Sequence, residues 1–252
     1  MIALTGATGF VGQALIDRAA AAGEEVRALA RRPQPERARV AWVAGDLADK
    51  EALARLVDGA DAVIHVAGVV STPDPAGFET GNVAGTLNLV EAALAARVTR
   101  FVHVSSLSAR EPGLSLYGAS KRRGEKIVMA APLEWTVVRP PAIYGPRDAE
   151  LLDVFKLATR GVVPLPPRGQ RSVIHVDDLA RLLLALVPGG DDVRHKLFEP
   201  DDGKPGGWPQ ACFARAIGWA VGRRVRPLAL PALALKLAAR GDRLVRGSRA
   251  KL

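Results

Sequence analysis

The chain alternates short apolar runs with longer segments in which apolar residues recur every three or four positions. The short runs lie at 1–4, 24–30, 40–45, 61–68, 100–106 and 135–140. The segments with helical spacing lie at 10–23, 50–59, 83–98 and 117–130. Strands that alternate with helices of this length favour right-handed crossovers and a mostly parallel sheet. The pattern therefore predicts an α/β fold built on a doubly wound parallel sheet.

A different pattern follows the stretch RPPAIYGPRD. A helix is expected near 149–160, a proline-rich stretch comes next, and the chain becomes rich in Gly, Pro and Arg beyond Pro188. Such frequent Gly and Pro residues are typical of an appended lobe rather than of a continuing sheet. We expect a Rossmann-like domain over 1–187, with 146–171 contributing to a small lobe whose remainder lies at 188–252.

The composition limits the class of protein. With 252 residues, of which 48% are hydrophobic, the chain can bury a large core. The formal net charge is +9, but Lys and Arg are spread along the sequence rather than collected in one tract, so no nucleic-acid partner is expected. The four histidines lie far apart without the spacing of metal ligands, and no metal site is expected.

The expected location rests on three features of the sequence. No charged segment or apolar signal precedes the first predicted strand, and no apolar run is long enough to cross a bilayer. The single cysteine, Cys212, fits a reducing compartment. We expect a cytoplasmic protein.

The stretch LTGATGFVGQAL, residues 4–15, places Gly6, Gly9 and Gly12 three residues apart between a predicted strand and a predicted helix. Backbone N–H groups at such a helix start point at an anion, and glycine lets a ligand approach closely. The usual dinucleotide fingerprint is one residue tighter, so the spacing alone also fits a simple strand-to-helix turn. In this context the loop predicts a cradle for the pyrophosphate of a dinucleotide.

Arg31 and Arg32 end the second predicted strand, about twenty residues after Gly12. An acidic residue at this position would bind the ribose 2′-hydroxyl of NAD, and none is present. A planar guanidinium instead accommodates the 2′-phosphate of NADP. We therefore expect NADP as the cofactor, with NAD as the alternative cofactor and a solvated arginine pair as the purely structural interpretation.

The stretch LYGASKRRGEK places Tyr117 and Lys121 four residues apart on one face of a predicted helix. A nearby ammonium favours the phenolate of a tyrosine, which brings its proton exchange toward neutral pH. Ser105 and Ser106 end a buried strand upstream, at the sheet edge where such folds bind ligands. Together these residues predict a site for proton transfer to a substrate oxygen.

Eight motifs within 1–187 resemble, in order, those of one enzyme superfamily: TGATGFVG, GDL, HVAG, NVAGTLNLVEAA, VSS, YGASK, RPPAIYGP and IHVDDLA. The chain is similar to extended or atypical short-chain dehydrogenases/reductases, and within them to the NAD(P)-dependent epimerase/dehydratase and 3β-hydroxysteroid-dehydrogenase-like branch. Agreement of many motifs in one order is specific. The resemblance implies an NAD(P)-binding domain over the matched part of the chain.

The resemblance also implies roles for individual residues. Tyr117 would be the general acid/base, Lys121 its activator and ribose ligand, and Ser106 the group that polarises the substrate oxygen, with Ser105 as the alternative serine. Asn82 resembles an asparagine that supports a proton relay. The implied cofactor contacts come from the glycine loop, the following strand ends and the Tyr–Lys helix: Gly6, Thr8, Gly9, Phe10, Val11, Gly12, Arg31, Arg32, Asp46, Leu47, Ala67, Gly68, Tyr117, Lys121, Pro140 and Ile143.

These residues predict an NADP(H)-dependent oxidoreductase that moves a hydride between nicotinamide and a ketone, an aldehyde or a secondary alcohol. We expect the enzyme to act on a small-molecule substrate as a monomer or a homodimer. Leu107 and Ser108 stand where the sugar dehydratases of the superfamily carry an acidic pair, so dehydration is disfavoured. Two other hypotheses are an NAD(P)-dependent sugar epimerase and a non-catalytic scaffold or regulator that binds NADPH.

The stretch LPALALKLAARGDRLVRG, residues 230–247, predicts a helix that covers the substrate pocket. Lys236, Arg240 and Arg243 would lie on its exposed side. An anchor on an anionic membrane is the weaker alternative, because Gly241 interrupts the helix and the apolar face has no large aromatic residue.

Overall fold

The computed structural model describes residues 1–149, 151–165 and 169–229. Within it the chain forms two compact units. The first unit comprises Met1–Pro141 and His175–Pro200, and the second comprises Ala142–Ile174 and the chain from Asp201 onward. The segment 230–247, for which a helix is predicted, lies outside the described residues.

A seven-stranded sheet forms the centre of the first unit, with the strand order β11-β6-β5-β4-β1-β2-β3. Each neighbouring pair is parallel, so the prediction of a doubly wound parallel sheet is confirmed. The strands are β1 (Ile2–Thr5), β2 (Val26–Ala30), β3 (Val40–Ala44), β4 (Ala62–His65), β5 (Arg100–Val104), β6 (Glu134–Val138) and β11 (Lys196–Phe198). The strand order reverses between β1 and β4, the position at which open α/β sheets bind ligands.

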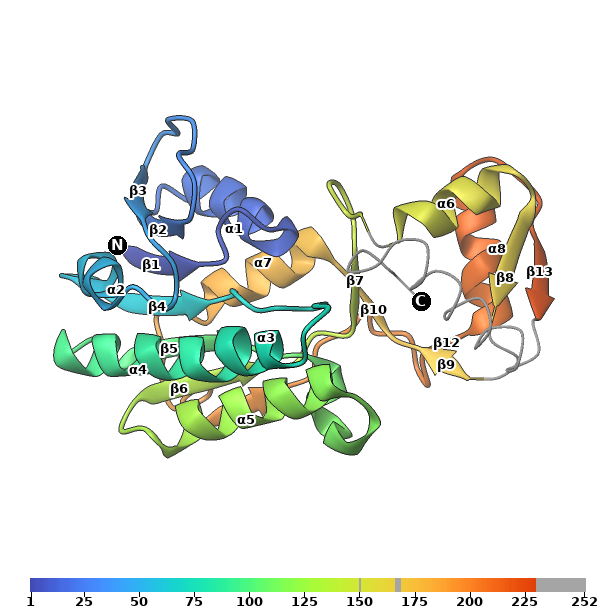
Figure 1. The fold of residues 1–252 in the computed structure, drawn as a ribbon. Coiled ribbons are helices and arrows are strands. Elements are labelled where there is room, and N and C mark those ends of the chain that lie inside the picture. The colour runs from blue at the N-terminus through green and yellow to red at the C-terminus, as the bar shows by residue number, and fades with distance from the viewer. Residues whose placement is uncertain (150, 166–168, 230–252) are drawn as a thin grey trace. The chain divides into compact units, whose positions relative to one another are not determined.

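Helices cover both faces of this sheet (Figure 1). On one side α1 (Phe10–Ala21) packs against α7 (Val176–Ala185). On the other side lie α2 (Lys50–Val57), α4 (Gly85–Ala95) and α5 (Leu116–Ala130), with α2 and α5 each in contact with α4. The central strands read as continuous apolar runs because both of their faces are buried.

The core beneath α2, α4 and α5 holds fourteen buried apolar residues: Ala3, Leu29, Ala52, Leu53, Leu56, Val57, Val63, Leu89, Val90, Ala93, Val98, Phe101, Val128 and Leu133. The helices present them at helical spacing, as Leu53, Leu56 and Val57 do on α2. Asp49 caps that helix by accepting a hydrogen bond from the Ala52 N–H at 2.9 Å. This packing fixes the helices on which the candidate site residues lie.

The helix predicted at 83–98 begins differently from a regular α-helix. Short α3 (Ala76–Phe78) leads into a π-helical segment, η1 (Glu79–Ala84), before α4 starts. π-Helical turns are rare and occur often at functional sites. This segment carries Asn82, which is buried.

Residues 188–200 join the sheet unit because β11 pairs in parallel with β6 and forms the edge strand. The apolar pattern instead predicts that these residues belong to the small lobe over 188–252. Strand β11 is only three residues long and lies in a segment rich in Gly, Pro and Arg, so its apolar pattern is too short to predict a strand.

The second unit has its own small core. It contains α6 (Leu152–Thr159), α8 (Gln210–Ala220) and the strand pairs β7–β10, β8–β13 and β9–β12. These strands are β7 (Ala142–Tyr144), β8 (Val162–Leu165), β9 (Gln170–Arg171), β10 (Val173–His175), β12 (Trp208–Pro209) and β13 (Arg226–Ala229). Buried apolar residues join them: Ala158, Val163, Leu165, Val173, Phe213, Ala214 and Ile217. Among the helices of the described ranges, none is long and apolar enough to cross a membrane.

Candidate cofactor crevice and active site

The glycine loop connects β1 to α1 and is closely packed. Gly6 has φ of +75°, and a Cβ built there would lie 2.6 Å from the backbone nitrogen of Ala67. A Cβ on Gly12 would lie 2.1 Å from the Gly6 carbonyl oxygen. Both positions therefore require glycine for the loop to close against β4 and α1.

Gly9 is exposed and lies at the N-cap of α1. The nearest heavy atom to a Cβ built on it is the Gly6 carbonyl oxygen at 3.3 Å, so one side of the loop is open to a ligand. No side chain caps the helix, and its first turn carries no acidic residue. The N–H groups and the positive end of the helix dipole thus favour an anion, which fits the pyrophosphate of a dinucleotide.

The other loop residues of the predicted cradle surround this opening. Thr8 is exposed, and Phe10 and Val11 are half-buried in the first turn of α1. The Gln13 side chain donates to the Ala7 carbonyl oxygen at 3.0 Å and helps to fix the loop.

Arg31 and Arg32 follow β2 and are exposed. Neither guanidinium bonds to another residue in the part of the chain that the structure describes. Arg37, which the sequence pattern did not indicate, forms an ion pair with Asp17 and donates to Gln13 Oε1 at 2.9 Å. These bonds tie the segment after Arg32 to α1, beside the glycine loop.

Asp46 and Leu47 follow β3. The Asp46 side chain accepts a hydrogen bond from the Ala48 N–H at 2.8 Å, so it forms a local turn, and it is exposed. The Leu47 carbonyl oxygen accepts from Asn88 Nδ2 at 2.8 Å. Leu47 also contacts the backbone of α4, since a Cβ on Gly85 would lie 2.8 Å from its Cδ1.

Gly68 brings the end of β4 close to two polar side chains. A Cβ built on it would lie 3.1 Å from Asn82 Oδ1 and 3.5 Å from Lys121 Nζ. Asn82 accepts from the Val69 N–H at 2.7 Å and donates to the Val69 carbonyl oxygen and to Ser120 Oγ, each at 2.9 Å. Asn82 therefore ties the strand end that carries Ala67 and Gly68 to α5.

Lys121 lies on α5, one turn after Tyr117, and only 5% of it is exposed. Its Nζ donates to the Val104 carbonyl oxygen, at the end of β5, over 2.8 Å. Burial lowers the pKa of Lys121 to about 8, although the carboxylate of Glu125 acts in the opposite direction. The Tyr117 ring is half-buried, with its centroid 6.2 Å from that of Phe78.

The two adjacent serines after β5 differ in their surroundings. Ser105 is buried, and its hydroxyl donates to Glu125 Oε1 at 2.6 Å. Ser106 is half-buried, and its Oγ accepts from the Ser108 N–H at 3.2 Å, which leaves its own proton available.

Glu125 is fully buried and binds Arg139 through two hydrogen bonds, from Nε at 2.7 Å and from Nη2 at 2.8 Å. Burial alone raises the pKa of Glu125, but hydrogen bonds from Arg139, Ser105 and Arg122 outweigh it and hold the pKa below its usual value. Arg139 also donates to Glu199 at 3.1 Å. The sequence pattern did not predict this cluster, because its members come from separate elements of the chain.

Pro140 follows β6, is buried, and accepts a hydrogen bond from the Leu107 N–H at 2.9 Å. Ile143 lies in β7 of the second unit. The first unit alone therefore brings together the ends of β1, β4, β5 and β6 with α5.

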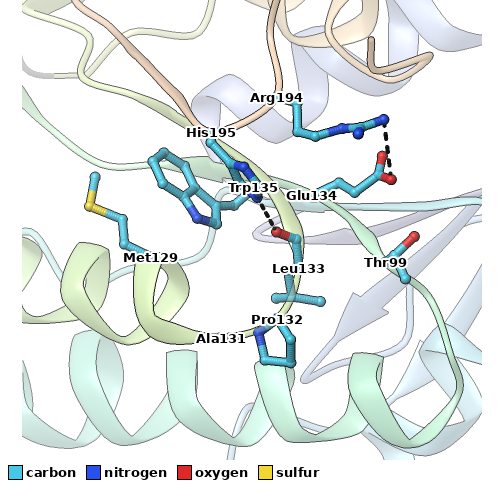
Figure 2. Close-up of a pocket in the computed structure, with 9 residues that line it drawn as sticks. All are labelled: Thr99, Met129, Ala131, Pro132, Leu133, Glu134, Trp135, Arg194 and His195. Carbon is cyan, nitrogen blue, oxygen red and sulfur yellow. Dashed lines mark hydrogen bonds and ion pairs between the residues drawn. The ribbon is translucent and has the colours of Figure 1, made fainter. Parts of the chain in front are cut away.

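A pocket of about 630 Å³ lies elsewhere, at the starts of β5 and β6. Figure 2 shows Trp135 and His195 side by side in it, with His195 bonded to the Leu133 carbonyl oxygen and Arg194 paired with Glu134. Ligands of open α/β sheets bind at the opposite, carboxyl ends of the strands. We therefore do not assign this pocket to the candidate site.

The fold and the glycine loop define a dinucleotide-binding α/β protein of the doubly wound class. The chain belongs to the NAD dependent epimerase/dehydratase family, whose model matches residues 2–197. The family predicted from the motifs is confirmed.

Two relatives carry names that describe reductases. The chain is 42% identical over 242 residues to a ceramide reductase of Caulobacter vibrioides, and the alignment covers 92% of this chain and 74% of that protein. It is 34% identical over 221 residues to a 2-alkyl-3-oxoalkanoate reductase of Stenotrophomonas maltophilia, and this alignment covers 75% of this chain and 66% of that protein.

Solved structures share the fold. MoeE5 in complex with UDP-glucose and NAD has 24% identity and a TM-score of 0.75, with 92% of this chain and 85% of that chain covered. The UDP-N-acetylglucosamine 4-epimerase from Bacillus cereus has 22% identity and a TM-score of 0.74, with 91% and 84% covered. Family and relatives together identify the chain as an NAD(P)-dependent enzyme of the short-chain dehydrogenase/reductase type, with the activity of an oxidoreductase or an epimerase.

Proposed function

We propose that this enzyme is an NADPH-dependent reductase of a ketone, with Ser106, Tyr117 and Lys121 as its catalytic residues. The observation that carries the proposal is the bond from Lys121 Nζ to the Val104 carbonyl oxygen at 2.8 Å. It fixes the helix that carries Tyr117 to the strand end that carries Ser106. The two reductase relatives support the direction of the reaction.

Each residue has a separate role in the proposed reaction. Ser106 donates a hydrogen bond to the carbonyl oxygen and polarises it. Tyr117 gives its proton to that oxygen as the C–O π bond breaks, and the Lys121 ammonium stabilises the resulting phenolate. NADPH, when bound, supplies the hydride to the carbonyl carbon, so that the products are a secondary alcohol and NADP⁺.

The preference for NADPH rests on Arg31 and Arg32. Both side chains are exposed after β2 and are not engaged with other described residues, so they are free to bind a 2′-phosphate. Replacing both by Ala should weaken NADPH binding about ten- to a hundredfold and leave NADH binding nearly unchanged. The matched control is Arg97→Ala, an exposed arginine after α4. Equal losses for both cofactors in a fluorescence titration would refute the assignment.

The proposed substrate is a ketone carried on long alkyl chains. Both relatives are named for molecules that contain alkyl chains. Leu114 and Leu116, just before Tyr117, are 84% and 61% exposed. Val70, which follows the end of β4, is 58% exposed. Large apolar side chains left exposed beside a candidate site favour an apolar ligand.

A substrate panel tests this proposal. Turnover of NADPH should be faster with long-chain ketones, presented in mild detergent, than with short-chain ketones or nucleotide sugars. Leu114→Asp should raise KM for the long-chain ketones and leave the Kd for NADPH unchanged. Conversion of a nucleotide sugar without net NADPH consumption would instead support an epimerase.

A further inference from the structure

A chain of hydrogen bonds runs through the buried region beneath the proposed cofactor crevice. The Ala67 N–H donates to Thr5 Oγ1 at 3.3 Å, and Thr5 Oγ1 lies 2.7 Å from His65 Nδ1. On the other side of the ring, His65 Nε2 lies 2.9 Å from Thr86 Oγ1, which donates to the Asn82 carbonyl oxygen at 2.9 Å. Thr5, His65, Thr86 and Asn82 are each at most 2% exposed.

The direction of this chain follows from its proton count. The single hydroxyl proton of Thr86 goes to the Asn82 carbonyl oxygen, so toward His65 the Thr86 oxygen only accepts. His65 therefore carries its proton on Nε2. A neutral imidazole then has a lone pair on Nδ1, which accepts the hydroxyl proton of Thr5.

The surroundings keep this ring neutral. Burial, with a contribution from the Lys121 ammonium, lowers the pKa of His65 to about 3. At neutral pH the ring is thus one tautomer with one donor and one acceptor. Each of the four residues that this series of hydrogen bonds connects therefore has its hydrogen-bonding partner.

The chain of hydrogen bonds joins the ends of β1 and β4, which form the two walls of the proposed cofactor crevice. Thr5 directly precedes Gly6, and Gly6 packs against the Ala67 backbone, so Thr5 and Ala67 lie where the strand order reverses between β1 and β4. The Asn82 side chain continues the connection to Val69 and to Ser120 on α5. One ring therefore links the glycine loop, the end of β4 and the helix that carries Tyr117 and Lys121.

We infer that His65, as the neutral Nε2–H tautomer, is a positioning residue that sets the cofactor crevice through Thr5 and Asn82. This inference rests on the proposed NADPH site. His65 itself does not touch cofactor or substrate in this role. It fixes the segments that do.

His103 provides a matched control for burial and ring packing. It lies beside His65 on β5, with ring centroids 5.2 Å apart, and it is 1% exposed. Neither of its ring nitrogens bonds to any residue of the described chain. If burial of an aromatic ring were the only contribution of His65, both histidines would respond alike to Phe.

The experiment combines variants with two readouts. His65→Phe should raise the Kd for NADPH about five- to tenfold, and His103→Phe should leave it within about twofold. His65→Asn and His65→Gln, which each offer a polar group to one side of the chain, should bind NADPH more tightly than His65→Phe. If His65 acts through packing alone, the order of affinities is reversed, and His65→Phe binds NADPH most tightly of the three variants.

The tautomer is measured directly in the wild-type enzyme by ¹⁵N NMR of the histidine rings, with Nε2 protonated and Nδ1 unprotonated as the expected result. Thr86→Val, which removes one hydroxyl, should shift this tautomer and weaken NADPH binding even if the His65 variants fail to fold. An Nδ1–H tautomer, or normal NADPH binding by Thr86→Val, would overturn this inference and leave the proposed function standing. Failure of the wild-type enzyme to bind NADPH would overturn the proposed function and this inference with it.

Discussion

The buried ammonium of Lys121 gives the free energy of unfolding a specific dependence on pH. Burial lowers its pKa from 10.5 to about 8 in the folded protein. The unfolded chain recovers the usual value, so between these two pKa values it binds more protons than the folded protein does. The free energy of unfolding must therefore rise with pH in that window.

The size of this effect follows from the two pKa values. The Lys121 ammonium costs the folded protein about 3 kcal/mol at pH 7 and less than about 1 kcal/mol at pH 10. Raising the pH from 7 to 10 should thus add about 2 to 3 kcal/mol to the free energy of unfolding through this one group.

The assay is urea-induced unfolding at several pH values, followed by circular dichroism, for the wild-type enzyme and two variants. Lys121→Met lacks the titrating group and should lose the added stability between pH 7 and pH 10. Lys126→Met, on the same helix but at an exposed position, should keep it. Parallel pH curves for the wild-type enzyme and Lys121→Met would refute the reasoning, because the buried ammonium would then carry no cost.

Three further outcomes are expected. Tyr117→Phe should keep its affinity for NADPH and lose about a hundred- to ten-thousandfold in turnover, and unchanged turnover would exclude the proposed acid. Glu125→Gln should lose about 3 to 5 kcal/mol of stability in urea, because Arg139 is left buried beside a neutral amide; a loss below 1 kcal/mol contradicts this. Ser106→Ala should lower kcat about a hundred- to a thousandfold, whereas Ser105→Ala should mainly lower stability.

The sequence predicted the sheet well because its strands are buried on both faces. Strands β1, β4 and β5 read as short apolar runs between turn residues, and β2 and β6 follow the same pattern. The edge strand β11 was not predicted, since its three residues pair with β6 from about sixty positions away in the chain. The π-helical segment that holds Asn82 was also missed, because apolar spacing does not distinguish it from the start of an α-helix.

The candidate site was predictable where its residues form local motifs. The glycine loop and the Tyr117–Lys121 pair are short stretches, and the structure gives each the predicted strand, loop or helix context. The contacts that hold them in place are long-range. His65 meets Thr5 from sixty positions away, and Arg139 meets Glu125 from fourteen. Spacing in a sequence carries no signal for such pairs, so only the fold reveals them.

The proposed choice of Ser106 over Ser105 rests on contacts in the fold that the motif does not contain. Successive residues leaving a strand point to opposite sides, so two adjacent serines cannot share one environment. Ser105 points to Glu125 and is committed to the buried ion pair, while Ser106 starts the next turn with its hydroxyl proton free. A serine whose proton already binds a carboxylate cannot donate it to a substrate oxygen. The same bond that makes Ser105 useful for stability therefore assigns the proposed contact with substrate to Ser106.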